Sequence, residues 1–157
     1  MTAVERRSFT VKASGILRQL VTPCFVSETS TIAVSTPRPL SRRYRSLWDT
    51  GATFSMITNR VAGDLNLRAD GSITLRHAGG QAEGVPIFYV NLLLYNNVEI
   101  ADVRVGLVDA RDFDVIIGMD IINRGDFAVS NRDGATSFSF RIPSVEDFDF
   151  SAEDSQL

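Results

Sequence analysis

Residues 46–57, SLWDTGATFSMI, place one carboxylate, Asp49, inside an otherwise apolar or small-residue run. Burying an unpaired charge beside Leu47 and Trp48 is strongly unfavourable. The strand is therefore expected to end here, where Gly51 supplies the backbone freedom for a sharp turn whose N–H groups point back to the carboxylate. The segment predicts an apolar strand followed by a hydrogen-bonded loop that holds the Asp49 side chain.

The rest of the chain reads as short β-rich runs with little helix. Strands are expected within residues 16–34, at 53–58, on both sides of Gly79 and Gly80 as a long hairpin, at 115–117, and on both sides of the turn 132–134. Asn59 is expected to cap a short helix, and Asn96 and Asn97 to form a turn. Many short strands predict an all-β barrel or sandwich.

The length of 157 residues suits one domain with its own core. We expect a flexible leader at 1–14, the domain at 15–142 and an acidic flexible tail at 143–157, where five acidic residues occur without Lys or Arg. A net charge of −3 gives no support for a nucleic-acid or membrane partner. The stretch of arginines at 38–45 and the tail are interpreted first as solvated surface.

Single copies of histidine and cysteine exclude several kinds of site. His77 and Cys24 cannot assemble a zinc site from one chain, and no metal or other cofactor is expected. A Cys24 nucleophile with a His77 base is less favoured than a buried structural cysteine and a loop histidine. A single cysteine also fits a reducing compartment, so we expect a cytoplasmic protein, with neither a signal peptide nor a membrane span.

Three segments in order give the chain a family resemblance. Asp49-Thr50-Gly51-Ala52 follows an apolar strand, a glycine-containing hairpin comes next, and Ile116-Ile117-Gly118 comes later. In this order the segments resemble the retropepsin-like (retroviral-type) family of aspartic peptidases. The resemblance spans roughly residues 42–142. Met119-Asp120 after the glycine is closer to cellular and bacterial members than to viral ones, which usually have arginine there.

The resemblance implies an aspartic endopeptidase in which paired aspartates activate water to hydrolyse a polypeptide. Two carboxylates at short range share a proton, so one polarises the scissile carbonyl and the other accepts a proton from water. Asp133 is rejected as the second aspartate because it follows no apolar strand and lies in an expected hairpin turn. One chain then holds half a site, and a two-fold homodimer would pair Asp49 with its own copy.

The resemblance also assigns supporting residues. Thr50, Gly51 and Ala52 would form the active-site loop, and Ile116, Ile117 and Gly118 would pack beneath it. The hairpin tip would be a flap over the substrate, formed by His77, Ala78, Gly79, Gly80 and Gln81. Trp48 is interpreted either as a core residue or as part of an interface or pocket.

Two other functions stay open at this stage. The first is a retropepsin-fold dimer that serves as an interaction module with little or no proteolysis. The second is an unrelated small-molecule-binding β-barrel, in which the order of the motifs would be coincidence. A binding module does not need the acidic side chain of Asp49, so the intact Asp-Thr-Gly favours the peptidase.

Overall fold

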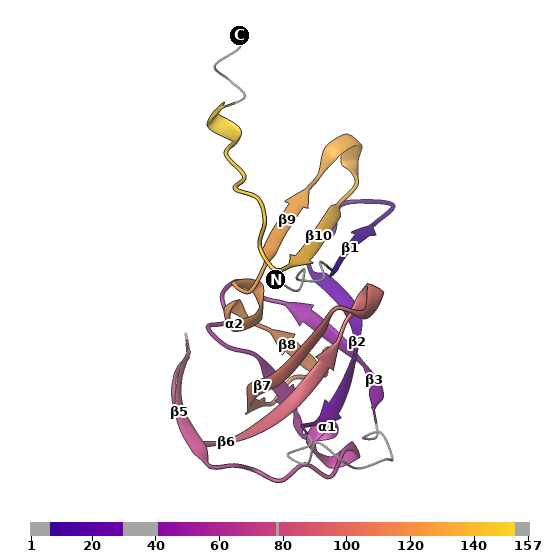
Figure 1. Ribbon diagram of the computed structural model, residues 1–157. Coiled ribbons are helices and arrows are strands. Elements are labelled where there is room, and N and C mark those ends of the chain that lie inside the picture. Colours follow the sequence, from indigo (N-terminus) through magenta and orange to yellow (C-terminus); the bar gives the residue numbers. More distant parts are fainter. Residues whose placement is uncertain (1–6, 30–40, 78, 153–157) are drawn as a thin grey trace.

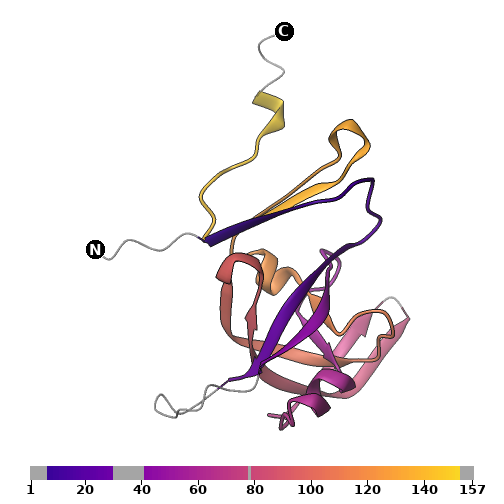
Figure 2. The ribbon, with the colours of Figure 1, turned by 90° about the vertical axis from the view of Figure 1, so that its right-hand side faces the viewer.

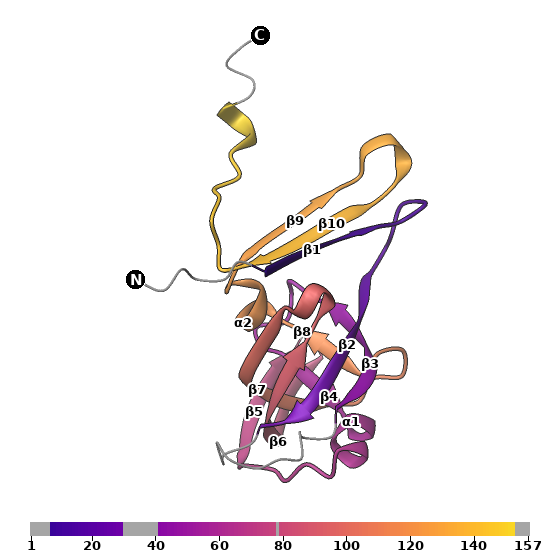
Figure 3. The ribbon, with the colours of Figure 1, turned by 45° about the vertical axis from the view of Figure 1, so that its right-hand side comes forward.

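A computed structural model describes residues 7–29, 41–77 and 79–152 of the chain. A seven-stranded sheet has the order β2-β3-β8-β4-β7-β6-β5, and an additional pairing of β2 with β6 closes it into a barrel. A second sheet of three strands, β1-β10-β9, lies across one end of this barrel (Figures 1 and 3). The predicted all-β fold is confirmed.

The barrel and the small sheet are built from different parts of the chain. Those of the barrel are β2 (Leu20–Glu28), β3 (Arg42–Trp48), β4 (Met56–Thr58), α1 (Asn59–Asp64), β5 (Ser72–His77), β6 (Gly80–Leu93), β7 (Glu99–Val108), β8 (Val115–Ile117) and α2 (Met119–Ile122). Those of the small sheet are β1 (Arg7–Lys12), β9 (Asp126–Ser130) and β10 (Ser137–Ile142). The 3₁₀ turns are Tyr95–Asn97, Arg132–Gly134 and Phe150–Ala152.

Strand β3 shows the alternation of a half-buried strand. Tyr44, Ser46 and Trp48 are buried, while Arg43 and Arg45 are exposed on the opposite face. On one side β3 pairs antiparallel with β2, and on the other its last three residues pair parallel with β8. Successive side chains of a strand point to opposite faces, so the inner row reaches the core and the outer row reaches solvent.

Trp48 lies at the centre of the aromatic contacts that join the two sheets. Its ring stacks on Phe127 at 5.6 Å between centroids and contacts Phe140 at 5.1 Å. Phe9 and Phe138 complete the cluster at 5.9 and 6.0 Å from the same ring. The indole N–H donates to Thr22 Oγ1, which satisfies its one polar group. Trp48 is therefore a core residue in this structure, and it holds the small sheet against the barrel.

The predicted leader of residues 1–14 is wrong for residues 7–12. These residues form β1, which pairs antiparallel with β10 from Arg7↔Ile142 to Lys12↔Ser137. Phe9 is buried in the aromatic cluster, and its burial favours an ordered strand over a solvated leader. Residues 1–6 lie outside the described part of the chain.

Other expectations differ from the structure only in detail. The short helix after β4 is present, but its N-cap is Thr58 rather than Asn59, and it has no side-chain cap bond. The chain turns at Asn96 and Asn97 and again at Asp133, all three of which have positive φ. Among the described helices, none combines the length and the apolar character needed to cross a membrane.

A buried carboxylate holds the start of the predicted tail to the small sheet. Asp126 begins β9, and its side chain is only 7% exposed. Its oxygens accept hydrogen bonds from the Ser144 hydroxyl, from the Val145 N–H and from the Arg141 guanidinium. Residues 144 and 145 are thus tied down, and the segment after them leads away from the barrel (Figures 1 and 2).

These hydrogen bonds, above all those from Ser144 and Val145, lower the pKa of Asp126 to about 2. The side chain of an aspartate in an unfolded chain has a pKa of about 3.9. The folded value is lower, so the stabilisation is complete above the unfolded pKa and is lost as the pH falls from about 4 to about 2. Asp126→Asn should therefore lower the melting temperature at pH 7 and approach wild type near pH 2.

Thermal unfolding followed by circular dichroism across this pH range measures the effect. Asp133→Asn is the control, because Asp133 is an exposed residue of the turn between β9 and β10. A difference between Asp126→Asn and wild type that stays constant from pH 7 to pH 2 would contradict the assignment.

Candidate active site

The Asp49 loop begins where β3 ends. The Asp49 N–H donates to the Ile117 carbonyl at 2.9 Å, which extends the β3–β8 ladder by one residue. The chain then turns, and Ala52 N–H donates back to the Asp49 carbonyl at 3.2 Å. The strand therefore delivers Asp49 to a fixed position at the start of a tight turn.

The Asp49 carboxylate is held by its own loop. The Gly51 N–H donates to Asp49 Oδ1 at 2.8 Å, and a Cβ at position 51 would lie 3.2 Å from the same oxygen. Asp49 itself is partly exposed, and Thr50 and Gly51 are exposed, whereas the preceding Trp48 is buried. The charge thus lies just outside the core, as the sequence of this segment predicts.

The segment after β8 packs directly against this loop. Met119 N–H donates to the Ala52 carbonyl at 2.8 Å. A Cβ on Gly118 would lie 2.7 Å from the backbone carbon of Phe54 and 2.9 Å from the Ala52 oxygen. No larger residue fits between these backbones without displacing them. The structure brings Asp49, Gly51, Ala52, Ile117 and Gly118 together, while Ile116 lies one residue earlier in β8.

A pair of polar side chains that the sequence analysis missed connects the two segments. Buried Ser55 donates from its hydroxyl to Asp120 Oδ1 at 2.8 Å and accepts from the Gly118 N–H at 3.0 Å. Asp120 Oδ1 also accepts from the Ile121 N–H at the start of α2. The sequence does place each residue close to one of the two motifs. Ser55 follows the Asp-Thr-Gly segment, and Asp120 follows Gly118. Neither residue belongs to a motif that carries chemistry by itself.

The predicted flap is the hairpin of β5 and β6. His77 pairs with Gly80 and Arg76 with Gln81, and Gly80 has a φ of +130° that favours glycine. Gly79, Gly80 and Gln81 are exposed at the tip, whereas Ala78 lies outside the described residues. Figure 2 shows the hairpin as an arm that extends beside the barrel.

A pocket of about 270 Å³ lies between the base of this hairpin and the segment after the Asp49 loop. Its walls include Phe54, which follows the loop, and the hairpin residues Ile73 and Ile87. The remaining lining residues are Asp102, Arg104, Val105, Asp120 and Arg124.

The other candidate groups do not converge on the Asp49 loop. Asp133 lies in the 3₁₀ turn between β9 and β10, as expected. Cys24 is fully buried in β2, and this burial raises the pKa of its thiol to about 12, which makes it an inert structural cysteine. Within the described ranges, no cluster of three or more His, Cys, Asp or Glu residues could hold a metal ion.

Comparison with known proteins agrees with this geometry. Residues 41–124 match the family of the gag-polyprotein putative aspartyl protease, and the matched region contains both the Asp49 loop and Gly118. The chain belongs to this aspartyl protease family. No curated protein matches the sequence significantly.

Solved structures place the fold among retropepsin-like proteins. The chain superposes on a retropepsin-like aspartic protease from Rickettsia conorii with a TM-score of 0.56 at 13% identity, covering 90% of this chain and 98% of that one. Two further structures are similar at lower TM-scores. They are the EIAV protease complexed with the inhibitor HBY-793 (0.47, 20% identity, 67% and 86% coverage) and the retroviral protease-like domain of Ddi1 from Leishmania major (0.48, 14% identity, 86% and 100% coverage).

The contact at Gly118 gives the first test of the site. Gly118→Ala forces the new Cβ against the backbone of Phe54, and overpacking of this kind costs about 1–3 kcal/mol of the free energy of unfolding. Gly63→Ala in α1 is the matched control, because a Cβ there meets nothing within 4 Å and alanine favours the helix. Urea denaturation measures both variants. Equal stability of the two would contradict the close approach at Gly118.

Proposed function

We propose that this protein is an aspartic endopeptidase whose active site forms when two copies of the chain pair their Asp49 loops. The observation that carries the proposal is the position of the Asp49 carboxylate, which is fixed by the Gly51 N–H at 2.8 Å and partly open to solvent. Membership of the aspartyl protease family supports the same reaction.

The proposed reaction is hydrolysis of a peptide bond by water. Two Asp49 carboxylates at short range cannot both ionise, which is the known behaviour of aspartic protease dyads. The protonated carboxyl donates a hydrogen bond to the scissile carbonyl, and the ionised one accepts a proton from the attacking water. The protonated group then supplies a proton to the leaving amine. We propose an activity maximum at acidic to near-neutral pH, since the dyad must retain one proton.

A homodimer is required because one chain supplies one such loop. In the described part of the chain, Asp49 is the only aspartate that follows an apolar strand and precedes the Thr-Gly turn. A two-fold axis beside this loop brings the second carboxylate into place. The exposed Thr50 hydroxyl is proposed to bond across the axis to the partner loop.

The substrate is proposed to be an extended polypeptide. The β5–β6 hairpin is proposed as the flap, with its tip residues His77–Gln81 closing over the substrate and adding backbone hydrogen bonds. The pocket beside Phe54 is then available to a substrate side chain. No cofactor is proposed, and a cytoplasmic location fits the single buried cysteine.

Asp49→Asn tests the catalytic assignment. The substitution keeps the shape of the side chain but removes the proton-accepting group, so cleavage of a diverse peptide mixture should fall at least about 100-fold across acidic to neutral pH. Sedimentation velocity checks that the variant still dimerises. Asp133→Asn, at an exposed aspartate of the turn between β9 and β10, is the matched control.

Cleavage by wild type that a statine-type transition-state mimic blocks would support the proposal further. If neither wild type nor Asp49→Asn cleaves while both form dimers, the interaction module becomes the better reading.

Dilution tests the need for two chains. Below the dissociation constant of the dimer, the dimeric fraction falls in proportion to concentration, so the specific activity should fall with it. The rate of peptide cleavage is measured over a thousandfold dilution with the oligomeric state followed in parallel. Undiminished specific activity in a verified monomer would overturn the dimeric dyad.

A further inference from the structure

The outer face of the barrel carries a row of side chains that changes from apolar to cationic across three strands. Leu93 of β6 pairs with Phe25 of β2, and Phe25 pairs with Arg43 of β3. Pro23 and Arg45 form the next pair along β2 and β3. Directly paired residues project from the same face of a sheet, so these side chains lie next to one another on the surface.

The cationic side of this row borders a cleft. Its lining includes Pro23, Arg43, Arg45, Arg60 and one acidic residue, Asp114. Arg60 pairs with Asp114 at 3.1 Å, while the Arg45 guanidinium lies over the Phe113 ring at 5.8 Å. No hydrogen bond or ion pair found within the described residues involves the Arg43 side chain. The cleft therefore has an excess of positive charge.

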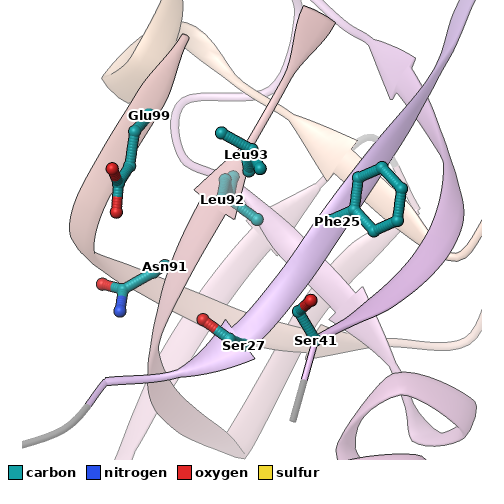
Figure 4. A pocket seen from close by; sticks show the side chains of 7 residues that line it. All are labelled: Phe25, Ser27, Ser41, Asn91, Leu92, Leu93 and Glu99. Carbon is teal, nitrogen blue, oxygen red and sulfur yellow. The ribbon is translucent and has the colours of Figure 1, made fainter. Parts of the chain in front are cut away.

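The apolar side of the row borders a hollow of about 280 Å³. Figure 4 shows Phe25 at its rim, with Leu93 and Asn91 on the far side and Glu99 beyond them. Phe25 is 40% exposed although it lies in the middle of a strand pairing. A cavity of roughly 150 Å³ holds a benzene ring, so the hollow has room for one phenyl side chain.

The C-terminal segment Glu146–Phe150 has the complementary composition. It reads Glu-Asp-Phe-Asp-Phe and contains no basic residue. Phe148 and Phe150 are 47% and 74% exposed, which is unusual for large aromatic side chains. Residues 146–149 precede the 3₁₀ turn, and in an extended conformation their alternate side chains would point to opposite sides. The acidic row, Asp147 and Asp149, would then separate from Phe148.

We propose that residues 146–150 of one chain dock on the β2–β3 face of a second copy. Asp147 and Asp149 contact Arg43 and Arg45, and a phenylalanine ring enters the hollow beside Phe25. Glu99 lies on the far side of this hollow, so the acidic row is directed toward β3 rather than β6. When each chain docks its segment on the other, the two copies form a closed dimer. This docking does not depend on whether Asp49 is catalytic.

The geometry favours a second copy over the chain's own face. The bonds to Asp126 fix Val145 at the end of the barrel where α2 lies, and the following residues lead away from it (Figures 1 and 3). Asp147 is two residues beyond Val145, a reach of about 7 Å. Arg43 lies near the start of β3, at the other end of the barrel beside α1 (Figure 1).

Titration of a labelled peptide of residues 144–152 tests the docking directly. The receptor is the full chain carrying Asp147→Lys and Asp149→Lys, so that its own segment does not compete, and Asp49→Asn, so that no peptide is cleaved. Saturable binding is expected, and adding Arg43→Glu and Arg45→Glu should weaken it at least tenfold. Adding Arg68→Glu and Arg132→Glu, two exposed arginines elsewhere, is the matched control and should leave it unchanged.

Absence of saturable binding, or equal loss in the two arginine pairs, would overturn the proposal. A peptide with Phe148→Ser and Phe150→Ser should also bind at least fivefold more weakly. Equal affinity of that peptide would overturn the assignment of the hollow to these rings.

Sedimentation velocity of the full chain tests whether the docked segment belongs to a second copy. Every protein in this experiment also carries Asp49→Asn. Self-association should weaken in Arg43→Glu/Arg45→Glu and in Asp147→Lys/Asp149→Lys, and it should recover when all four substitutions are combined. Association that is the same in all four proteins would overturn the exchange between copies, even if the peptide binds. The readout uses no cleavage, so failure of the peptidase proposal leaves this test intact.

Discussion

The parallel pairing of β3 with β8 sets the geometry of the whole site. Because Trp48 pairs with Ile117, the next residue on each strand, Asp49 and Gly118, meet at the same end of the barrel. Backbone hydrogen bonds from Asp49 to Ile117 and from Met119 to Ala52 then fix the two segments to each other. Gly118 allows this approach, and the Ser55–Asp120 pair satisfies the polar groups that the approach buries. The carboxylate is therefore positioned by backbone rather than by a flexible side-chain network.

The same strand joins the site to the rest of the core. The residue before Asp49 is Trp48, whose ring contacts phenylalanines from all three strands of the small sheet. A shift of the small sheet would therefore move the end of β3. Asp126 fixes the other side of that sheet by tying residues 144 and 145 to β9. The stability of the aromatic cluster and the position of the Asp49 loop are therefore coupled, because Trp48 and Asp49 are adjacent in the chain.

Local patterns in the sequence were sufficient to predict the features that depend on residues close together in the chain. The Asp49 turn, the β5–β6 hairpin and the short helix after β4 are examples, because each follows from glycine positions or from the spacing of apolar residues. The packing of Gly118 beneath the loop was expected from the family resemblance. Strand β1 was missed because its partner β10 lies at the other end of the chain and only Phe9 marks its buried face. The bonds of Asp126 to residues 144 and 145 and the Ser55–Asp120 pair were missed for the same reason: each joins residues that only the tertiary fold brings together.

The pairing of Arg7 with Ile142 also has a consequence for the order of folding. Closing a loop between the two ends of a domain costs more entropy than closing a hairpin, and contacts of large sequence separation form slowly. During synthesis β1 emerges first but has no partner until β10 has left the ribosome. Until then the ring of Trp48 lacks the cover of Phe9, Phe138 and Phe140, so a nascent or truncated chain presents an aromatic surface to chaperones and to other chains.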